Sequence, residues 1–140
     1  MSYWLMKSEP GAWSWDEQVK AGGKGTAWTG VRNHQAKLNL MKMKKGDRAL
    51  FYHSGEDKAA VGVVEIARSA YPDPTAQAGE PWVVVDVKAL EPVPKPVSLE
   101  DIKKEAKLKE MALIKYSRLS VQPVTDAAWK RIMDKSGGVK

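Results

Sequence analysis

Three extended segments follow one another in the middle of the chain with only loops between them, and this run most constrains the fold. They are Arg48–His53, Ala60–Ala67 and Trp82–Leu90, and apolar, β-branched or aromatic side chains dominate them. Strands joined by loops pair with their neighbours in sequence, so we expect a mostly antiparallel or mixed sheet. A doubly wound nucleotide-binding fold is disfavoured because the β-α-β alternation that it needs is missing.

Helix signals lie on both sides of this run. Polar side chains suited to N-capping predict helices that start at Ser14, Asn33, Ser98 and Thr125, and the first forms a capping box with Glu17. A further short helix is expected within Leu108–Ile114, and extended segments at Tyr3–Lys7 and Arg118–Pro123. The prolines of Glu91–Pro96 exclude a helix or an inner strand there. We therefore predict one α+β domain over residues 1–140, with a curled, barrel-like sheet.

The net charge of +6 and the pI near 9.5 favour contact with a polyanion, of which nucleic acid is the first candidate. Lysines cluster at Lys37–Lys45 and Lys103–Lys109. Each cluster either contacts phosphate or is an ordinary solvated surface, and the sequence leaves both open. The start of the chain does not have the pattern of a signal peptide, and no apolar segment approaches the roughly 18 residues that a membrane span needs. We expect a cytoplasmic protein without a membrane partner, and favour a monomer.

The segment Trp28–Asn33 carries the clearest functional signal. It places an indole, a glycine, a guanidinium and a carboxamide within six residues. A flat heterocycle stacks on an indole, while Arg and Asn present paired hydrogen-bonding groups to its edge. Phe51–Ser54 forms a second aromatic and polar cluster, and the six tryptophans are many for a chain of 140 residues. Two interpretations stay open: a pocket for a single base, or a core tryptophan followed by a helix start.

With these segments in place, the chain resembles the EVE domain family of the PUA-like superfamily. Six pieces in the family's order carry the resemblance over nearly the whole chain: Tyr3–Pro10, Trp28–Asn33, Phe51–Ser54, Tyr71–Asp73, Trp82–Val87 and Arg118–Val124. The resemblance is to small bacterial members that consist of one such domain. It implies a pseudo-barrel of about five or six strands surrounded by short helices. It also implies a cleft that recognises nucleic acid carrying a modified base. EVE domains are linked with 5-substituted cytosines in DNA, and the related YTH domains hold methylated adenine in RNA.

Carried onto this chain, the resemblance implies eleven ligand-binding residues: Lys7, Ser8, Trp28, Arg32, Asn33, His53, Ser54, Arg118, Leu119, Ser120 and Val121. Trp28 would stack on the base, and Arg32 and Asn33 would bind its edge or a phosphate. Lys7 would hold phosphate and Ser8 a base edge. For each of these five residues a purely structural role, as core, helix cap or solvated strand end, is the alternative.

The remaining candidates come from two segments. His53 and Ser54 would approach the cleft, although His53 is equally suited to a structural hydrogen bond. Arg118–Val121 would form the opposite wall, with apolar contact from Leu119 and hydrogen bonds from Ser120 and its backbone; the alternative is an ordinary edge strand. Tyr71 and Trp82 are expected to be structural.

Catalytic and metal signals are weak. The chain has no cysteine, and its two histidines, His34 and His53, occur without an acidic cluster or a His-x-x-x-His spacing. We expect no metal, cofactor or catalytic residue. The alternative functions are a small hydrolase of modified nucleosides, for which Lys7 and Glu9 are the pair to test, and an RNA-binding module in RNA metabolism. The ASCH branch of the PUA-like superfamily includes such hydrolases, but Lys7 and Glu9 do not match its motif. The base and the polymer stay open.

Overall fold

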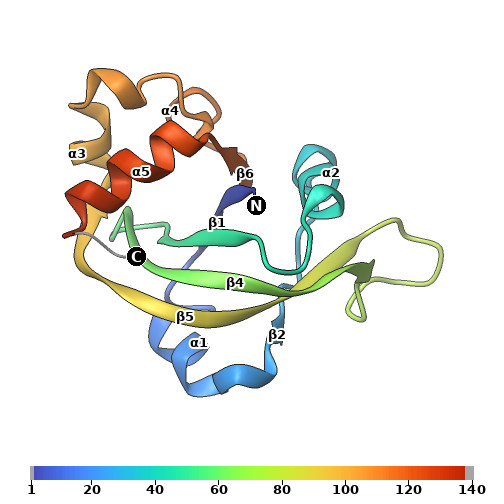
Figure 1. The fold of residues 1–140 in the computed structure, drawn as a ribbon. Coiled ribbons are helices and arrows are strands. Elements are labelled where there is room, and N and C mark those ends of the chain that lie inside the picture. Colours follow the sequence, from blue (N-terminus) through green and yellow to red (C-terminus); the bar gives the residue numbers. More distant parts are fainter. Residues whose placement is uncertain (1, 138–140) are drawn as a thin grey trace.

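A computed structural model describes residues 2–137, and its centre is a strongly bent, mixed sheet (Figure 1). The six strands occur in the order β2-β5-β4-β3-β1-β6. Their bounds are β1 Tyr3–Ser8, β2 Thr26–Ala27, β3 Arg48–His53, β4 Ala59–Pro72, β5 Val83–Ser98 and β6 Val121–Val124. The predicted α+β, PUA-like fold is confirmed.

Strand pairing explains why the sheet is mixed. β3, β4 and β5 form the antiparallel run that the sequence predicts, while β1 lies parallel to β3, with Lys7 opposite Tyr52. β6 pairs antiparallel with the outer edge of β1, so residues from the two ends of the sequence share one edge of the sheet.

The helices begin where the polar caps predict. Their bounds are α1 Trp15–Ala21, α2 His34–Lys42, α3 Leu99–Lys103, α4 Ala112–Lys115 and α5 Asp126–Lys135, with 3₁₀ turns η1 Gly22–Lys24 and η2 Ala106–Leu108. Ser14, Asn33, Ser98 and Thr125 each accept a hydrogen bond from the backbone N–H three residues later. The capping box of Ser14 and Glu17 is complete. In residues 2–137 no helix has the length and apolar character needed to cross a bilayer.

Three segments differ from the sequence-based expectation. β5 continues through the prolines of Glu91–Pro96, where it pairs with β4 on one side, while β2 pairs with β5 only at Asp86 and Val87. The part of β5 that holds the prolines therefore has β4 on one side and no strand on the other. Proline lacks a backbone N–H, and an unpaired strand edge is where this is tolerated. The expected helix over 108–114 is divided between η2 and α4, and residues 116–118 form a turn rather than the start of a strand.

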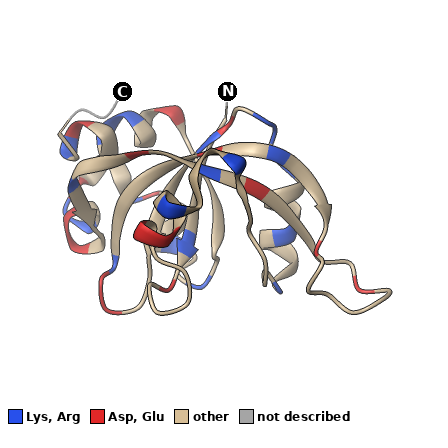
Figure 2. Cartoon of the chain, turned by 90° about the horizontal axis from the view of Figure 1, so that it is seen from below, with Lys and Arg blue, Asp and Glu red and all other residues tan. Residues whose placement is uncertain are grey.

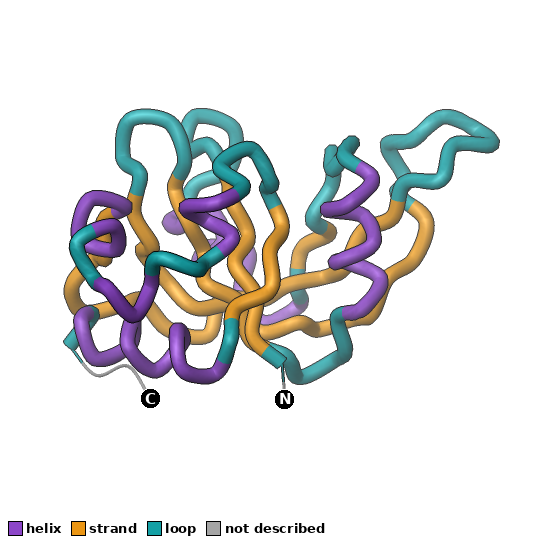
Figure 3. The backbone as a smooth tube through the Cα atoms, turned by 90° about the horizontal axis from the view of Figure 1, so that it is seen from above, coloured by secondary structure: helices purple, strands orange, loops and turns teal. Residues whose placement is uncertain are grey.

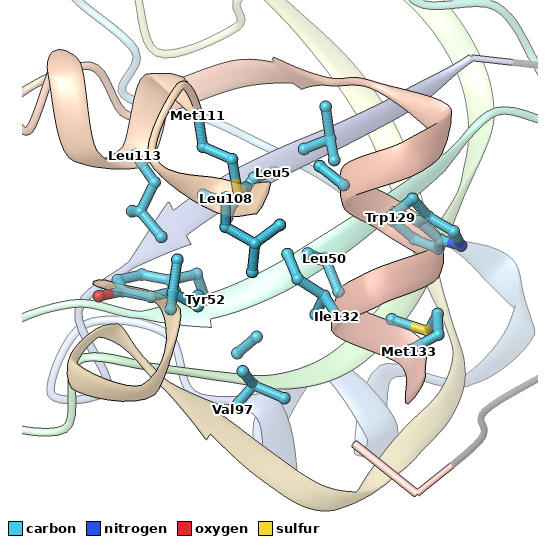
Figure 4. Packing of buried hydrophobic residues seen from close by; sticks show 14 of the residues in the cluster. Leu5, Leu50, Tyr52, Val97, Leu108, Met111, Leu113, Trp129, Ile132 and Met133 are labelled. Atoms are coloured by element: carbon cyan, nitrogen blue, oxygen red, sulfur yellow. The ribbon is translucent and has the colours of Figure 1, made fainter. Parts of the chain in front are cut away.

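Two apolar cores lie against the sheet. In the first, Trp129, Ile132 and Met133 of α5 pack toward Leu5 and Leu50 of the strands (Figure 4). The second contains Trp4, Trp15, Trp28, Leu40 and Phe51, among others. Figure 3 shows α3, α4 and α5 gathered at one end of the sheet and α2 standing apart from them at the other. Trp28, the main candidate for base stacking, is thus a member of the second core.

Candidate nucleic-acid interface

The end of β1, the turn that follows it and the segment around β2 enclose a cleft of about 440 Å³, here called the Trp28 cleft. Its lining residues are Lys7, Ser8, Glu9, Ala12, Trp13, Thr26, Ala27, Trp28 and Thr29. β2 positions the far wall, because the N–H of Trp28 donates to the carbonyl of Val85 on β5 over 2.9 Å. The volume lies within the range of sites that hold small organic ligands.

Hydrogen bonds and ring contacts fix the aromatic walls of the Trp28 cleft. The indole of Trp28 is 8% exposed and meets Phe51 edge-on, with ring centres 5.5 Å apart. On the other wall, Nε1 of Trp13 donates to the side-chain oxygen of Gln18 over 2.8 Å. Gln18 is fully buried and donates in turn to Thr26. Trp28 therefore combines the two roles that the sequence left open, since it both packs in the core and lines a cleft.

Lys7 supplies a positive charge at the cleft without an ion-pair partner among the described residues. Its Nζ donates to the backbone carbonyl of Ser117 over 2.5 Å, and its backbone N–H donates to the carbonyl of Ser120. Burial lowers the pKa of the Lys7 ammonium below its usual value. A partly buried cation that no carboxylate neutralises is well suited to an anionic ligand.

A second, larger hollow of about 790 Å³ lies between α2 and the segment from α4 to β6, and is here called the Tyr116 groove. It is lined by Asn33, Gln35, Asn39, Lys42, Ala112, Lys115, Tyr116, Ser117, Arg118, Leu119 and Pro123. The buried amide of Asn39 donates to the carbonyl of Val121 over 2.7 Å and so ties α2 to β6. Ser117, whose carbonyl accepts from Lys7, also lines this groove, so one hydrogen bond links residues of the two hollows.

The buried carboxylate of Asp73 holds the loop from Trp28 to Asn33 in place. It accepts hydrogen bonds from the backbone N–H of Gly30 and from Nη1 of Arg32, over 3.1 and 3.0 Å. Thr75 donates to it from both its backbone N–H and its hydroxyl. Burial acts to raise the pKa of Asp73, but the hydrogen bonds from Thr75, Arg32 and Gly30 outweigh it and lower the pKa to about 2. Gly30 has φ of +84°, in the left-handed region that favours glycine.

His53 lies at the end of β3 and faces α1. Its Nε2 accepts the backbone N–H of Trp15 over 3.0 Å, and its Nδ1 lies 3.0 Å from a carboxylate oxygen of Asp57. A ring nitrogen that accepts an N–H is unprotonated, so this arrangement assigns the proton to Nδ1, which donates to Asp57. His53 thereby joins β3 to the first turn of α1.

The structure divides the sequence-predicted residues among several places. Lys7, Ser8 and Trp28 line the Trp28 cleft, whereas Asn33, Arg118 and Leu119 line the Tyr116 groove. The side-chain oxygen of Asn33 caps α2, and the guanidinium of Arg32 donates to Asp73 and Thr75.

The other predicted residues lie elsewhere. Ser54 lines a separate hollow beside Glu56 and Asp57. The carbonyl of Ser120 accepts the backbone N–H of Lys7, and Val121 is fully buried. The single pocket expected around Trp28 and Asn33 is thus not present: the two residues line different hollows, which the hydrogen bond from Lys7 to Ser117 connects.

Sequence reasoning missed three residues that shape this region. The sequence alone assigns no role to Trp13 or Tyr116, and Asp73 enters the prediction only as the end of the segment Tyr71–Asp73. The sequence Asp73-Pro74-Thr75 holds a usable signal for Asp73, because an Asp side chain commonly accepts the N–H two residues later. No group of three or more His, Asp or Glu side chains that suits a metal ion occurs within residues 2–137.

The mixed sheet with short helices on its faces defines a PUA-like α+β protein, and its cleft is walled by indoles beside a cation. The chain belongs to the EVE domain family, whose model matches residues 2–135. Mouse thymocyte nuclear protein 1 is 36% identical over 94% of this chain and 72% of its own length. The solution structure of Rpa0253 from Rhodopseudomonas palustris is 55% identical and has a TM-score of 0.94, covering 100% of this chain and 96% of that one.

A third comparison includes a ligand. The crystal structure of human THYN1 in complex with DNA that contains 5-methylcytosine has a TM-score of 0.88 to this chain. The two sequences are 31% identical, and the match covers 100% of both chains.

Proposed function

We propose that this protein is a non-enzymatic reader that binds one modified base of a nucleic acid in the Trp28 cleft. The observation that carries the proposal is the arrangement of Trp13, Trp28 and Lys7 around one cleft of about 440 Å³. Indole surfaces favour a flat, aromatic ligand. In this proposal the ammonium of Lys7, which lines the same cleft, binds the phosphate of that nucleotide.

The human relative supports a 5-substituted cytosine as the preferred base, since its crystal structure contains 5-methylcytosine DNA. A base that enters a closed cleft has to leave its stack, which costs a few kcal/mol in a duplex. Contact with the indoles and hydrogen bonds to the base edge would offset this cost. Thr29 and the backbone around Ala27 and Trp28 offer polar groups on the same cleft.

The experiment measures binding of short oligonucleotides that carry cytosine, 5-methylcytosine or 5-hydroxymethylcytosine, as single strands and as duplexes of DNA and RNA. We expect tighter binding of a modified form. Trp28→Phe, which removes the larger ring, should weaken binding and reduce the preference. Trp129→Phe is the matched control, because Trp129 is also 8% exposed but lies in the other core. Equal affinity for plain and modified oligonucleotides of every kind would contradict the proposal.

A second candidate, a hydrolase of modified nucleosides, is favoured by one observation: Lys7 and Glu9 line the same cleft. A carboxylate beside an ammonium can support proton transfer. Incubation with a panel of modified nucleosides, followed by mass spectrometry, tests this function. Turnover that Glu9→Gln abolishes would replace the reader proposal, and absence of any product would leave Glu9 without a catalytic role.

A further inference from the structure

We propose that the Tyr116 groove binds the single-stranded nucleic acid that flanks the base held in the Trp28 cleft. The inference rests on the proposed function and extends it, since it makes the ligand a strand of several nucleotides rather than a free nucleoside. In this arrangement Tyr116 stacks on a neighbouring base, and Lys42 and Arg118 contact phosphates.

The exposure of Tyr116 is the first supporting observation. Its side chain is 63% exposed, more than that of any other large hydrophobic residue among those described. An aromatic ring left in water contributes little to folding, because its apolar surface is not buried. A ring beside a cationic groove is, in contrast, the platform on which single-stranded bases stack.

The charge of the groove is the second observation. Lys and Arg are spread over many elements of the molecule, with Asp and Glu among them (Figure 2), so the overall charge of +6 does not by itself locate a binding surface. The lining of the Tyr116 groove differs, because it contains Lys42, Lys115 and Arg118 and no Asp or Glu. Lys115 pairs with Glu110, whereas Lys42 and Arg118 have no ion-pair partner within residues 2–137.

The connection between the hollows is the third observation. Lys7 lines the Trp28 cleft, and its Nζ contacts the carbonyl of Ser117, which lines the Tyr116 groove. A strand whose base enters the cleft would thus pass the ammonium of Lys7 and continue between α2 and the turn at residues 116–118. The three cations then follow one path, as expected for a backbone that carries one charge per nucleotide.

Nucleic acid fits this surface better than an acidic peptide does. The groove combines an exposed ring with the exposed carboxamides of Asn33 and Gln35. The carboxamide of Asn39 is buried and bound to Gln35 and Val121, so it supports the groove from beneath. Carboxamides and rings recognise bases, whereas an acidic peptide needs the cations alone. A poly-glutamate competitor distinguishes the two ligands experimentally.

The test compares two kinds of probe. One is the free nucleoside of 5-methylcytosine or 5-hydroxymethylcytosine. The other is a single-stranded heptamer, an oligomer of seven nucleotides, that carries the same modified base or plain cytosine at its centre. Affinities are measured by calorimetry for wild type, Tyr116→Ala, Tyr116→Phe and the double variant Lys42→Ala/Arg118→Ala. Lys20→Ala/Lys103→Ala is the matched control, because both lysines are exposed and lie on α1 and α3, outside both hollows. Urea unfolding of each variant checks that it is folded.

We expect the heptamer to bind more tightly than the nucleoside. Tyr116→Ala should weaken heptamer binding by roughly 5- to 100-fold, much more than nucleoside binding, in line with the loss of one base–aromatic stack. Tyr116→Phe should restore most of the affinity. The Lys42→Ala/Arg118→Ala variant should lower the salt dependence of heptamer binding, with a log–log slope smaller by about 1.4 for two lost phosphate contacts.

The outcomes separate this inference from the proposed function. If Tyr116→Ala leaves heptamer affinity unchanged while a modified base is still preferred, the groove inference is wrong and the reader stands. If affinity depends on Tyr116 but not on the modification, the groove binds a strand and the reader proposal fails. Competition by poly-glutamate as effective as that by the heptamer, or no binding of any probe, overturns the groove inference.

Discussion

Gly62 of β4 lies directly beneath the ring of Trp15 in the second core. A Cβ built on Gly62 would lie 2.5 Å from three carbon atoms of that ring, closer than real carbon contacts allow. The ring has little freedom to retreat, because Trp15 is 8% exposed, packs on Phe51 and has its N–H bound to His53. The absence of a side chain at one residue therefore sets how closely α1 approaches the sheet.

We predict that Gly62→Ala lowers the free energy of unfolding by about 1–3 kcal/mol or more, because overpacking forces the neighbours out of place. Urea unfolding followed by tryptophan fluorescence measures this change. Gly11→Ala is the matched control, since a Cβ at Gly11 meets no atom within 4 Å and its φ is not positive. Equal stability of the two variants would show that α1 shifts without cost.

Asp73 acts at the same scale on the loop that contains Trp28. Its pKa of about 2 in the folded protein lies below the ordinary value of 3.8. The folded state thus favours the ionised form, and the stabilisation that this provides is complete above pH 4 and is lost as the pH falls toward 2. Protonation of Asp73 would release Arg32, which the carboxylate holds at 3.0 Å.

We predict that Asp73→Asn destabilises the protein by about 1–3 kcal/mol at neutral pH, since it removes the charge that Arg32 and the N–H groups of Gly30 and Thr75 share. The stability of the variant should also fall less steeply than that of wild type between pH 4 and pH 2. Urea midpoints across this range measure both effects. Parallel pH profiles for the two proteins would contradict the assignment to Asp73.

At the scale of elements, the helix starts follow from local chemistry. Ser14 shows this clearly, since its hydroxyl accepts the N–H of Glu17 and the Glu17 side chain accepts the N–H of Ser14. This exchange involves residues three apart, so it is readable from the sequence. The far ends of β4 and β5 cannot be read from the sequence in this way. Their length depends on pairs that are remote in sequence, such as Tyr71 with Val84 and Ala59 with Ser98.

We predict that Ser14→Ala lowers the free energy of unfolding by about 1 kcal/mol, the usual cost of losing an N-cap. Because α1 packs Trp15 into the second core, the loss should appear in global unfolding rather than only in local fraying. Ser69→Ala on β4 is the control, since Ser69 is exposed and its side chain makes no hydrogen bond among the described residues. A thermal shift of Ser14→Ala no larger than that of the control would argue against the cap.

The candidate site was predictable only in part, and the reason is again geometric. Lys7, Ser8 and Trp28 share a cleft, as the sequence-based resemblance implies. Asn33 lies five residues from Trp28, but the chain turns between them. Gly30 has a left-handed conformation there, and its N–H donates a hydrogen bond to the carboxylate of Asp73. The Asn33 side chain therefore caps α2 beside the other hollow. Tyr116 gave no signal because exposure of one tyrosine is a property of the folded surface.

At the scale of the whole molecule, the charge of +6 sets the strength of the long-range attraction for a polyanion, while the salt concentration sets its range. The two hollows nevertheless contain few cations. Three of them, Lys7, Lys42 and Arg118, lack an ion-pair partner among residues 2–137 and lie along the two hollows. In the groove proposal these three cations are the ones that contact phosphates.

We predict that the affinity for a single-stranded oligonucleotide falls with salt with a log–log slope of about −2, as three phosphate contacts give. Fluorescence anisotropy between 50 and 300 mM salt measures the slope, and the free nucleoside, which has no phosphate, serves as the salt-insensitive control. A slope steeper than about −5 would mean that the strand spreads over the lysine clusters outside the two hollows.

The pairing of β6 with β1 has a consequence for the order of events during synthesis. Residues 3–8 leave the ribosome early and find their parallel partner once β3 has followed, but the other edge of β1 stays open until residues 121–124 have been made. The carbonyl that orients Lys7 belongs to Ser117, just before that strand. A nascent chain therefore carries Trp13, Trp15 and Trp28 well before residues 117–124, which orient Lys7 and pair with β1, have been made.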